Sequence, residues 1–277
     1  MACKGPSKLL STLKALINAP HASPGVTTPS TRFAGALKEL VYEAREKGVG
    51  WRAWMTISAA TSTTLNCPQP WSIVDNQHNA LDPTVSSAEL VREIGLKCIS
   101  FSGVARTINC LTAFHADLPE DVAQELARRR PTRGMVGNNF ERFQKYMSGG
   151  WKLWNSIYKE HQARLYQKLG DVHPDLAPYI LFGHYGGLLA EISDEGMNVP
   201  GVRLGRGLTS VAAVAALRAQ TGVGRQVTSH IFGLINAYAL GAVYEDGEPE
   251  VVGESCWLRM RLLAGYLRLW ISFAPAL

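Results

Sequence analysis

The chain has 277 residues, of which 46% are hydrophobic and 18% are charged, and its mean hydropathy is -0.03. These values are typical of a globular protein with a sizeable core, and they exclude a disordered chain and a membrane protein with several spans. The net charge of +5 comes from the first 38 residues, which carry no acid; basic and acidic residues are equal in number from there on. Without a basic folded surface, nucleic acid is not expected as a partner.

Residues 1–29 form a basic segment, rich in Ser and Thr, ahead of the first strong helical pattern. We expect a solvated extension and a cytoplasmic protein; the alternative is an amphipathic helix that targets the chain to mitochondria. The five cysteines are widely spaced and include no CxxC pair. This pattern indicates neither a disulfide framework nor a thiolate zinc site, and it favours a reducing compartment.

Apolar residues recur at helical spacing through most of the chain, and no segment alternates as a strand would. Helices are expected over residues 31–47, 88–101, 107 onward, 120–130, 139–169, 176–192, 207–219, 225–244 and 255–273. Irregular connections are expected over 18–30, 66–85, 131–138 and 193–206. Gly149 and Gly150 are expected to kink or divide the longest helix. The sequence therefore predicts an all-α protein, and the charge-free stretch 226–244 reads as a buried core helix, not a membrane span.

A five-residue pattern occurs twice, at Ser102–Arg106 (SGVAR) and at Thr221–Arg225 (TGVGR). Each copy follows a largely apolar helical segment and precedes another one. Because the flanks match as well as the turns, duplication is the better explanation. We predict three parts: a basic N-terminal extension over 1–29, a first, degenerate helical repeat over 30–135, and a second repeat over 136–277.

Three segments of the second repeat carry a family likeness. They are His173–Tyr179 (HPDLAPY), the alanine-rich helix Leu208–Leu217, and Arg225–Asn236 (RQVTSHIFGLIN), where a Ser-His pair opens a helix of small residues. In this order they resemble the carboxymuconolactone decarboxylase and AhpD-like superfamily, with a fainter match over 88–126. The resemblance implies an AhpD-like helical fold and assembly into oligomers, with a homodimer as the default.

The peroxidase branch of that superfamily uses a CxxC pair with a downstream His, and this chain departs from it. Counting back from His230, the two cysteine positions hold Val223 and Gln226, and Cys110 of the first repeat stands alone. Peroxidase chemistry of that kind needs an attacking and a resolving thiol. The resemblance therefore points to the decarboxylase branch, which relies on acid–base chemistry.

Four residues are candidates for catalysis: His230, Arg225, His184 and Tyr185. Imidazole titrates near neutral pH and can carry a proton both ways, while a guanidinium fork suits a carboxylate or an enolate. A core histidine and a structural salt bridge are the alternative reading of His230 and Arg225. His184 and Tyr185 stand among glycines, which indicates close approach to a ligand or to another helix. Glu191 is seven residues from His184, and the two share a helical face if the helix continues through the glycines.

Four more residues are candidates for substrate binding: Arg106, Cys110, Trp154 and Asn236. Arg106 and Cys110 are the first-repeat counterparts of Arg225 and Ser229. A small buried hydrophobe is the commoner fate of a lone cysteine, and the aromatic stripe that contains Trp154 is more often core than ligand cage. No spacing typical of metal ligands occurs, so no metal and no cofactor are expected.

The sequence thus predicts a cofactor-independent enzyme for a small, apolar organic acid or carbonyl compound. The reaction would be proton transfer that leads to decarboxylation, isomerisation, elimination or cyclisation, with His230 moving the proton and Arg225 holding the anion. Two other classes stay open: a thiol-dependent oxidoreductase that uses Cys110, and a helical binding protein without catalysis. The expected partners are a small-molecule substrate and a second copy of the chain, with no membrane.

Overall fold

The computed structural model describes residues 11, 15, 30–46, 48–67, 84–129, 133, 140–191, 204–242 and 248. Within these ranges the chain is helical and contains no strand, so the predicted all-α class is confirmed. The helix expected over 255–273 and nearly all of the N-terminal extension lie outside the described residues. None of the described helices combines the length and the apolarity needed to cross a bilayer.

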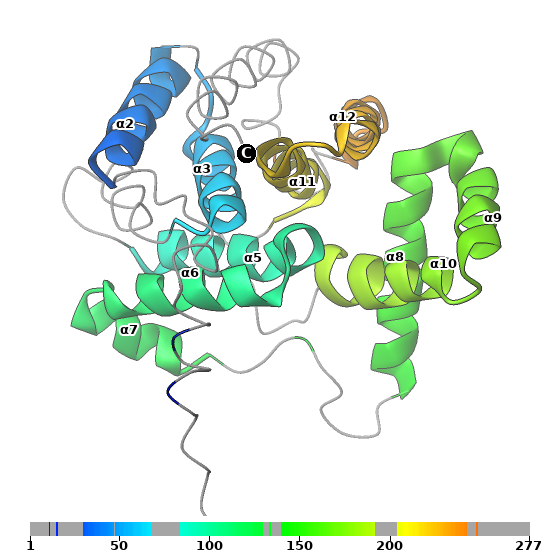
Figure 1. The fold of residues 1–277 in the computed structure, drawn as a ribbon, viewed down its shortest axis with the longest axis horizontal. Coiled ribbons are helices and arrows are strands. Elements are labelled where there is room, and N and C mark those ends of the chain that lie inside the picture. Colours follow the sequence, from blue (N-terminus) through cyan, green and yellow to red (C-terminus); the bar gives the residue numbers. More distant parts are fainter. Residues whose placement is uncertain are drawn as a thin grey trace, which may run out of the picture.

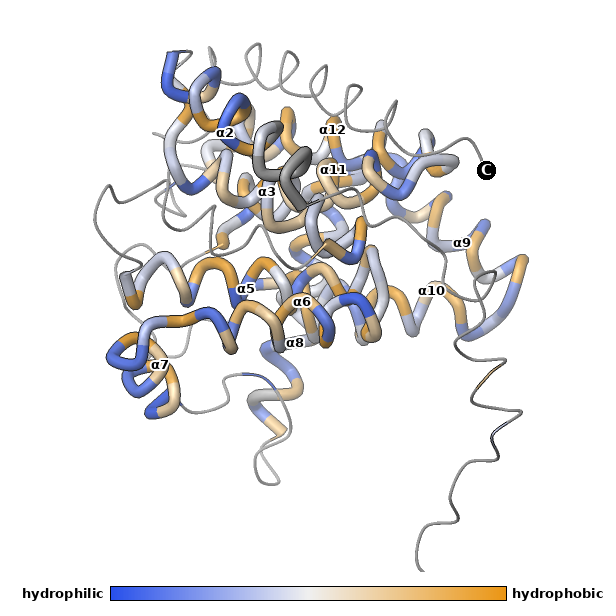
Figure 2. The backbone as a smooth tube through the Cα atoms, turned by 60° about the vertical axis from the view of Figure 1, so that its left-hand side comes forward, coloured by the Kyte–Doolittle hydropathy of each residue, from blue (hydrophilic) through white to orange (hydrophobic). Residues whose placement is uncertain are grey.

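The helices form two layers and a group at one end (Figures 1 and 2). One layer contains α2 (Ser30–Glu46), α3 (Trp51–Leu65), α11 (Arg206–Gln220) and α12 (Gly224–Ala239). The second contains α5 (Val85–Ser102), α6 (Val104–Ala116) and α7 (Glu120–Ala127). The end group contains α8 (Phe140–Tyr158), η1 (Lys159–His161), α9 (Gln162–Val172), α10 (Leu176–Tyr179) and the π-helix η2 (Ile180–Leu189).

The buried helix α3 lies at the centre and was not expected from the sequence. Twelve of its residues are buried, so it has no polar face to set up a helical pattern. Five of its six Ser and Thr hydroxyls donate to a carbonyl of the same helix: Ser58 donates to that of Trp54 at 2.7 Å and Ser62 to that of Ser58 at 2.7 Å, and Thr61 is the exception. Such bonds allow a run of small polar residues to lie in a core.

The repeated five-residue pattern forms a helix–turn–helix at both places. Gly103 joins α5 to α6 with φ +84°, and Thr221 and Gly222 join α11 to α12 with φ +62° and +70°. A positive φ is easy for glycine, which explains the glycine of each turn. Both predicted pairs of helices are therefore present, and the duplication that would explain them stays a prediction.

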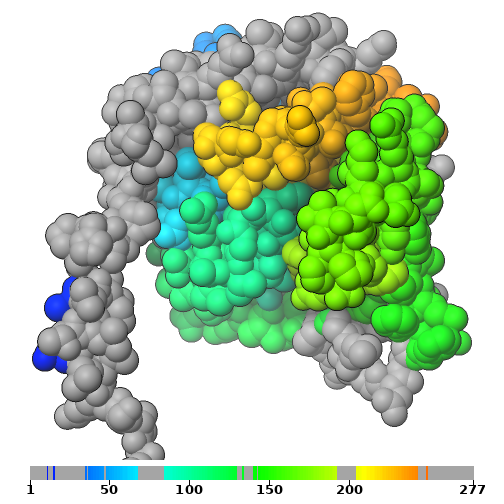
Figure 3. Space-filling model, turned by 45° about the vertical axis from the view of Figure 1, so that its right-hand side comes forward, coloured from blue at the N-terminus to red at the C-terminus, as the bar shows by residue number. Residues whose placement is uncertain are grey.

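One hydrophobic core crosses the predicted boundary at residue 135. It contains Leu37 and Ile94 from the first predicted repeat and Leu208 and Ala216 from the second. Helix α11 packs against α3 and α5, and η2 also packs against α5. In Figure 3 the segment that contains α11 and α12 lies directly against both the α5 region and the α8–η2 region.

Two features of the end group differ from what the sequence suggested. Gly149 and Gly150 do not divide the long helix, because α8 continues to Tyr158 and the break comes at η1, where Lys159 has φ +45°. The segment with His184 and Tyr185 is a π-helix that ends at Leu189, so the face argument that paired His184 with Glu191 does not apply. π-helical segments are rare in proteins, and those that occur are often found at functional sites.

Candidate functional site

A buried arginine, Arg206, lies where α8, α11 and α12 meet. It is 9% exposed and is the first residue of α11. Its Nε donates to Ser156 Oγ at 2.7 Å, its Nη1 to Ser210 Oγ at 2.7 Å, and its Nη2 to the carbonyl of Gly233 at 2.9 Å. These bonds to three elements fix the guanidinium in one position and place a positive charge inside the protein.

The carboxylate of Glu248 offsets the unfavourable position of Arg206 at a helix N-terminus, where the peptide dipoles are also positive. It accepts hydrogen bonds from the backbone N–H groups of Gly205 at 2.8 Å, Gly207 at 2.8 Å and Leu208 at 3.1 Å. Glu248 is itself fully buried. The start of α11 is therefore capped by a charge-assisted contact from a residue far along the chain.

His230 on α12 is buried close to Arg206. It is 6% exposed, and its Nδ1 has no hydrogen-bond partner in the described structure. The ring of Phe101 on α5 meets it edge to face, with centroids 5.7 Å apart. Burial, and then the charge of Arg206, lower the pKa of His230 to about 4. The imidazole is therefore neutral at pH 7, with one buried nitrogen unused.

Two tyrosines and a tryptophan form the next layer. The hydroxyls of Tyr158 on α8 and Tyr185 on η2 are hydrogen-bonded at 2.9 Å. Trp154 packs against both rings, with centroids 4.4 Å and 5.1 Å away. Burial raises the pKa of both phenols, while the charge of Arg206 acts in the opposite direction. The phenols thus stay protonated and lie within reach of the field of Arg206.

Arg225 does not join this cluster. It is an exposed residue in the first turn of α12, whereas His230 points into the core. The arginine that lies close to His230 is Arg206, which was not among the candidates chosen from the sequence. One signal marks it: Arg206 directly precedes residues 207–217, an eleven-residue stretch without a charge, so a helix that buries this stretch also buries its first residue.

The other predicted catalytic histidine, His184, lies beside α5. Its Nδ1 is 3.1 Å from Ser100 Oγ, and the centroid of its ring is 6.1 Å from that of the Tyr179 ring. Burial lowers the pKa of His184. The close approach that its neighbouring glycines predicted is to a helix: a Cβ on Gly186 would lie 2.6 Å from the carbonyl oxygen of Tyr146 on α8.

The first-repeat candidates lie apart from His230, between α3 and α6. The Arg106 guanidinium donates to the carbonyl of Thr64. Cys110 is fully buried, with its Sγ 3.8 Å from the carbonyl of Ser62, and burial raises the pKa of its thiol to about 12. Because the thiolate is the reactive form, this position does not favour redox chemistry.

Asn236, the last predicted contact residue, connects two helices. Its Nδ2 donates to the carbonyl of Ile157 at 3.1 Å, which ties α12 to α8 nearly two turns beyond His230. Gly233 lies between them, and a Cβ there would meet Ile157 at 3.2 Å. Asn236 therefore helps to hold His230 against α8.

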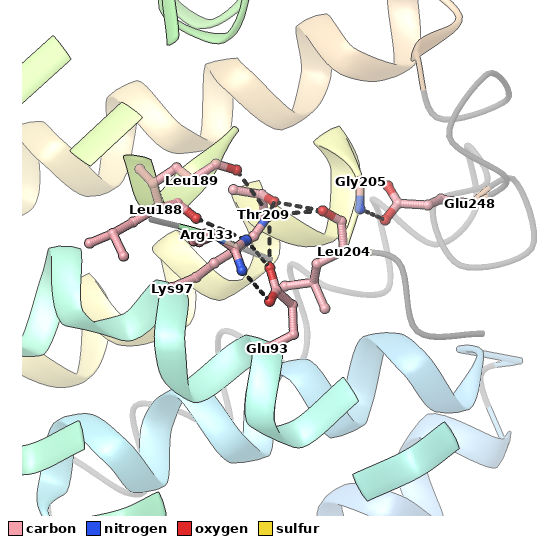
Figure 4. Close-up of polar contacts among 9 residues, drawn as sticks. All are labelled: Glu93, Lys97, Arg133, Leu188, Leu189, Leu204, Gly205, Thr209 and Glu248. Atoms are coloured by element: carbon pink, nitrogen blue, oxygen red, sulfur yellow. Dashed lines mark hydrogen bonds and ion pairs between the residues drawn. The ribbon is translucent and has the colours of Figure 1, made fainter. Parts of the chain in front are cut away.

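A second polar cluster surrounds Lys97 on α5 (Figure 4). Its Nζ donates to the carbonyls of Leu189 and Leu204, both at 2.9 Å, and to Thr209 Oγ1 at 2.7 Å. Glu93 is 3.9 Å away and is itself paired with Arg133. Burial lowers the pKa of Lys97 to about 8, against the charges of Glu93, Glu191 and Glu248. In the described ranges no three His, Cys, Asp or Glu side chains are placed to hold a metal ion.

Comparison with known proteins gives one distant likeness. The chain is 27% identical to Peroxisomal protein 2 of Saccharomyces cerevisiae over 199 residues, which are 65% of this chain and 67% of that protein. No family model matches the chain. No solved structure matches it significantly. The resemblance to the carboxymuconolactone decarboxylase-like proteins and the cytoplasmic location therefore stay predictions.

Proposed function

We propose that this protein is a cofactor-independent enzyme of the carboxymuconolactone decarboxylase-like type, which moves a proton on a small organic acid or carbonyl compound. The observation that carries the proposal is the pair of His230 and Arg206. A neutral imidazole with a buried, unused Nδ1 lies beside a fixed buried positive charge. A polar group that is left unsatisfied in a core is costly, and it needs an explanation such as a ligand or a catalytic role.

In the proposed step, Nδ1 of His230 takes a proton from the carbon next to the substrate carbonyl. The electron pair of the C–H bond moves to the carbonyl oxygen and forms an enolate. The charge of Arg206 and the hydroxyl of Tyr158 stabilise that oxygen. Where the substrate also has a carbon–carbon double bond next to that carbon, the enolate is conjugated with it; the imidazolium then returns the proton to the far carbon of that double bond, the carbonyl re-forms, and the double bond has moved by one position.

A substrate with a carboxylate β to the carbonyl follows a second course. The C–C bond to the carboxylate breaks, carbon dioxide leaves, and the enolate carbon takes a proton from the imidazolium. The protonated His230 needed for this step is disfavoured in the empty site, because Arg206 and burial hold its pKa at about 4. An anionic substrate offsets the charge of Arg206, so binding raises the pKa of His230 toward its ordinary value.

The test uses β-keto acids and unsaturated lactone acids, with carboxymuconolactone among them, and follows carbon dioxide release and ultraviolet absorbance. His230→Gln and Arg206→Met should each lower the rate at least about 100-fold, as expected for the loss of a general base or of an anion stabiliser. Arg225→Met, a matched change at an exposed arginine of α12, should leave the rate unchanged. Turnover that survives in His230→Gln, or that disappears in Arg225→Met, would contradict the proposed site.

A further inference from the structure

Lys97 provides a three-way connection between elements that are far apart in sequence. Its side chain is 1% exposed, and its ammonium group has three hydrogens for three acceptors. The acceptors belong to the last residue of η2, to the connection just before α11, and to the first turn of α11. A single group on α5 thus holds two other elements, as the dashed lines of Figure 4 show.

The acceptors of Lys97 flank the residues of the proposed site. Leu189 is four residues after Tyr185, while Leu204 and Thr209 lie on either side of Arg206. The same helix α5 also contacts the site one turn later, where Phe101 meets His230. These three bonds therefore help to set the position of α11 relative to η2, and with it that of Arg206 relative to Tyr185.

A hydrophobic residue could fill this volume without the cost of burying a charge. Replacing a buried charged group by a well-packed apolar one is often neutral or stabilising. The acids that face Lys97 are Glu93, Glu191 and Glu248, and Arg133 is the cation near it. Glu93 is 3.9 Å from Nζ and also pairs with Arg133, so the ammonium is held chiefly by its three hydrogen bonds. Such an arrangement fixes geometry more than it adds stability.

We infer that Lys97 is a positioning residue of the proposed site: its ammonium fixes the start of α11, which carries Arg206, against the end of η2, which carries Tyr185. The inference rests on the proposed function, because it is that function which makes His230, Arg206 and Tyr185 a catalytic site. The contacts themselves are independent of any substrate. Lys97 acts only through other residues, because all three of its hydrogens are engaged.

The test measures the titration of His230 by NMR of protein with 15N-labelled histidine, assigned with His230→Gln, and amide hydrogen exchange over 180–191 and 204–212. In Lys97→Met the start of α11 is released and Arg206 is less well fixed near His230. The pKa of His230 should therefore rise toward its ordinary value, by up to about one unit because burial remains, and exchange in both segments should become faster. Lys152→Met, a change of an exposed lysine on α8, should alter neither measurement.

Thr209→Val is the milder variant, since it removes only one acceptor. It should raise the pKa of His230 by less than Lys97→Met does. If Lys97→Met does not fold, Thr209→Val alone provides the test. A folded Lys97→Met, or failing it Thr209→Val, with unchanged His230 titration and unchanged exchange would overturn the inference. Neither readout involves turnover, so an inactive wild-type protein would contradict the proposed function and leave this result intact.

Discussion

His230 combines two properties that oppose each other in a stable core. Its burial and the nearby Arg206 favour the neutral imidazole, yet the neutral ring keeps an Nδ1 that no described group satisfies. An apolar side chain would avoid both costs. In the proposed function, this unused nitrogen is the atom that accepts the proton of the substrate.

Because the pKa of His230 is lowered in the folded protein, the stability of the protein depends on pH in the acid range. The folded-state pKa of about 4 is below the ordinary value of 6.5, so the unfolded chain binds more protons between these values. The contribution to stability is complete above pH 6.5 and is lost as the pH falls toward 4, by about 1 kcal/mol for each pH unit. Urea unfolding at several pH values should show this slope in the wild type and a flatter one in His230→Gln.

The control for this prediction is His161→Gln, because His161 is an exposed residue of η1 whose side chain is 77% accessible. Its pH profile should coincide with that of the wild type. If the His230→Gln profile has the wild-type slope between pH 6.5 and 4, then His230 is not held neutral by the fold.

At the residue scale, the sequence identified the histidine of the cluster but not its arginine. His230 was selected through the family resemblance, in which a Ser-His pair opens a helix of small residues; from the residues alone, a core histidine was the favoured reading. Arg225 was favoured by its nearness in sequence, but helix α12 turns it to solvent. Arg206 comes from another helix, and no local pattern reports a contact between α11 and α12. Cys110 is fully buried, which agrees with the commoner reading of a lone cysteine as a small hydrophobic residue of the core.

At the scale of elements, the close contact between α8 and η2 depends on glycines. A Cβ on Gly150 would lie 2.8 Å from the backbone nitrogen of Gly186, and one on Gly186 would lie 2.6 Å from the carbonyl oxygen of Tyr146. Both obstacles are backbone atoms, which cannot rotate away. This contact brings Tyr185 next to Tyr158, so the glycines help to form the aromatic part of the site.

Gly186→Ala should therefore lower the free energy of unfolding by about 1–3 kcal/mol, as overpacking of a core does. Gly187→Ala is the matched control on the same π-helix, since its Cβ would meet Phe182 O at 3.5 Å, an ordinary contact. That control should be neutral or stabilising by up to about 1 kcal/mol, because alanine restricts the unfolded chain more than glycine does. Equal effects from both changes, measured by chemical denaturation, would show that the contact is looser than described.

Element prediction succeeded for amphipathic helices such as α2 and for the alanine-rich, buried helix α11, but it missed the buried helix α3. The pattern over 31–47 corresponds closely to α2, whose bounds differ by one residue at each end. Helix α3 is buried on nearly all sides, and its Thr and Ser residues weaken the apolar signal that remains. The π-helical form of η2 depends on tertiary contact with α8, which no spacing of side chains in the sequence encodes.

At the scale of the whole molecule, the larger hydrophobic core contains residues of both predicted repeats, while a smaller one around Trp154 and Tyr185 lies in the end group. Helix α11 from the second predicted repeat packs against α3 and α5 from the first, and the alanines Ala212 and Ala216 are fully buried at this level. Small side chains allow α11 to approach α3 and α5 closely. A boundary near residue 135 therefore does not separate two independent hydrophobic cores in the described structure, which a local reading of the sequence could not reveal.

Ala216→Leu tests whether the two predicted repeats depend on the same hydrophobic core. Three added heavy atoms in a filled core should lower the free energy of unfolding by about 1–3 kcal/mol. Because the core extends from α2 to α12, the wild type should unfold in one transition, and the variant should shift that whole transition to lower temperature in calorimetry. Ala239→Leu, at the exposed end of α12, should leave the midpoint in place. Two separate transitions, with only one moved by Ala216→Leu, would instead show that the halves fold as independent domains and that α3 and α11 contribute little to holding them together.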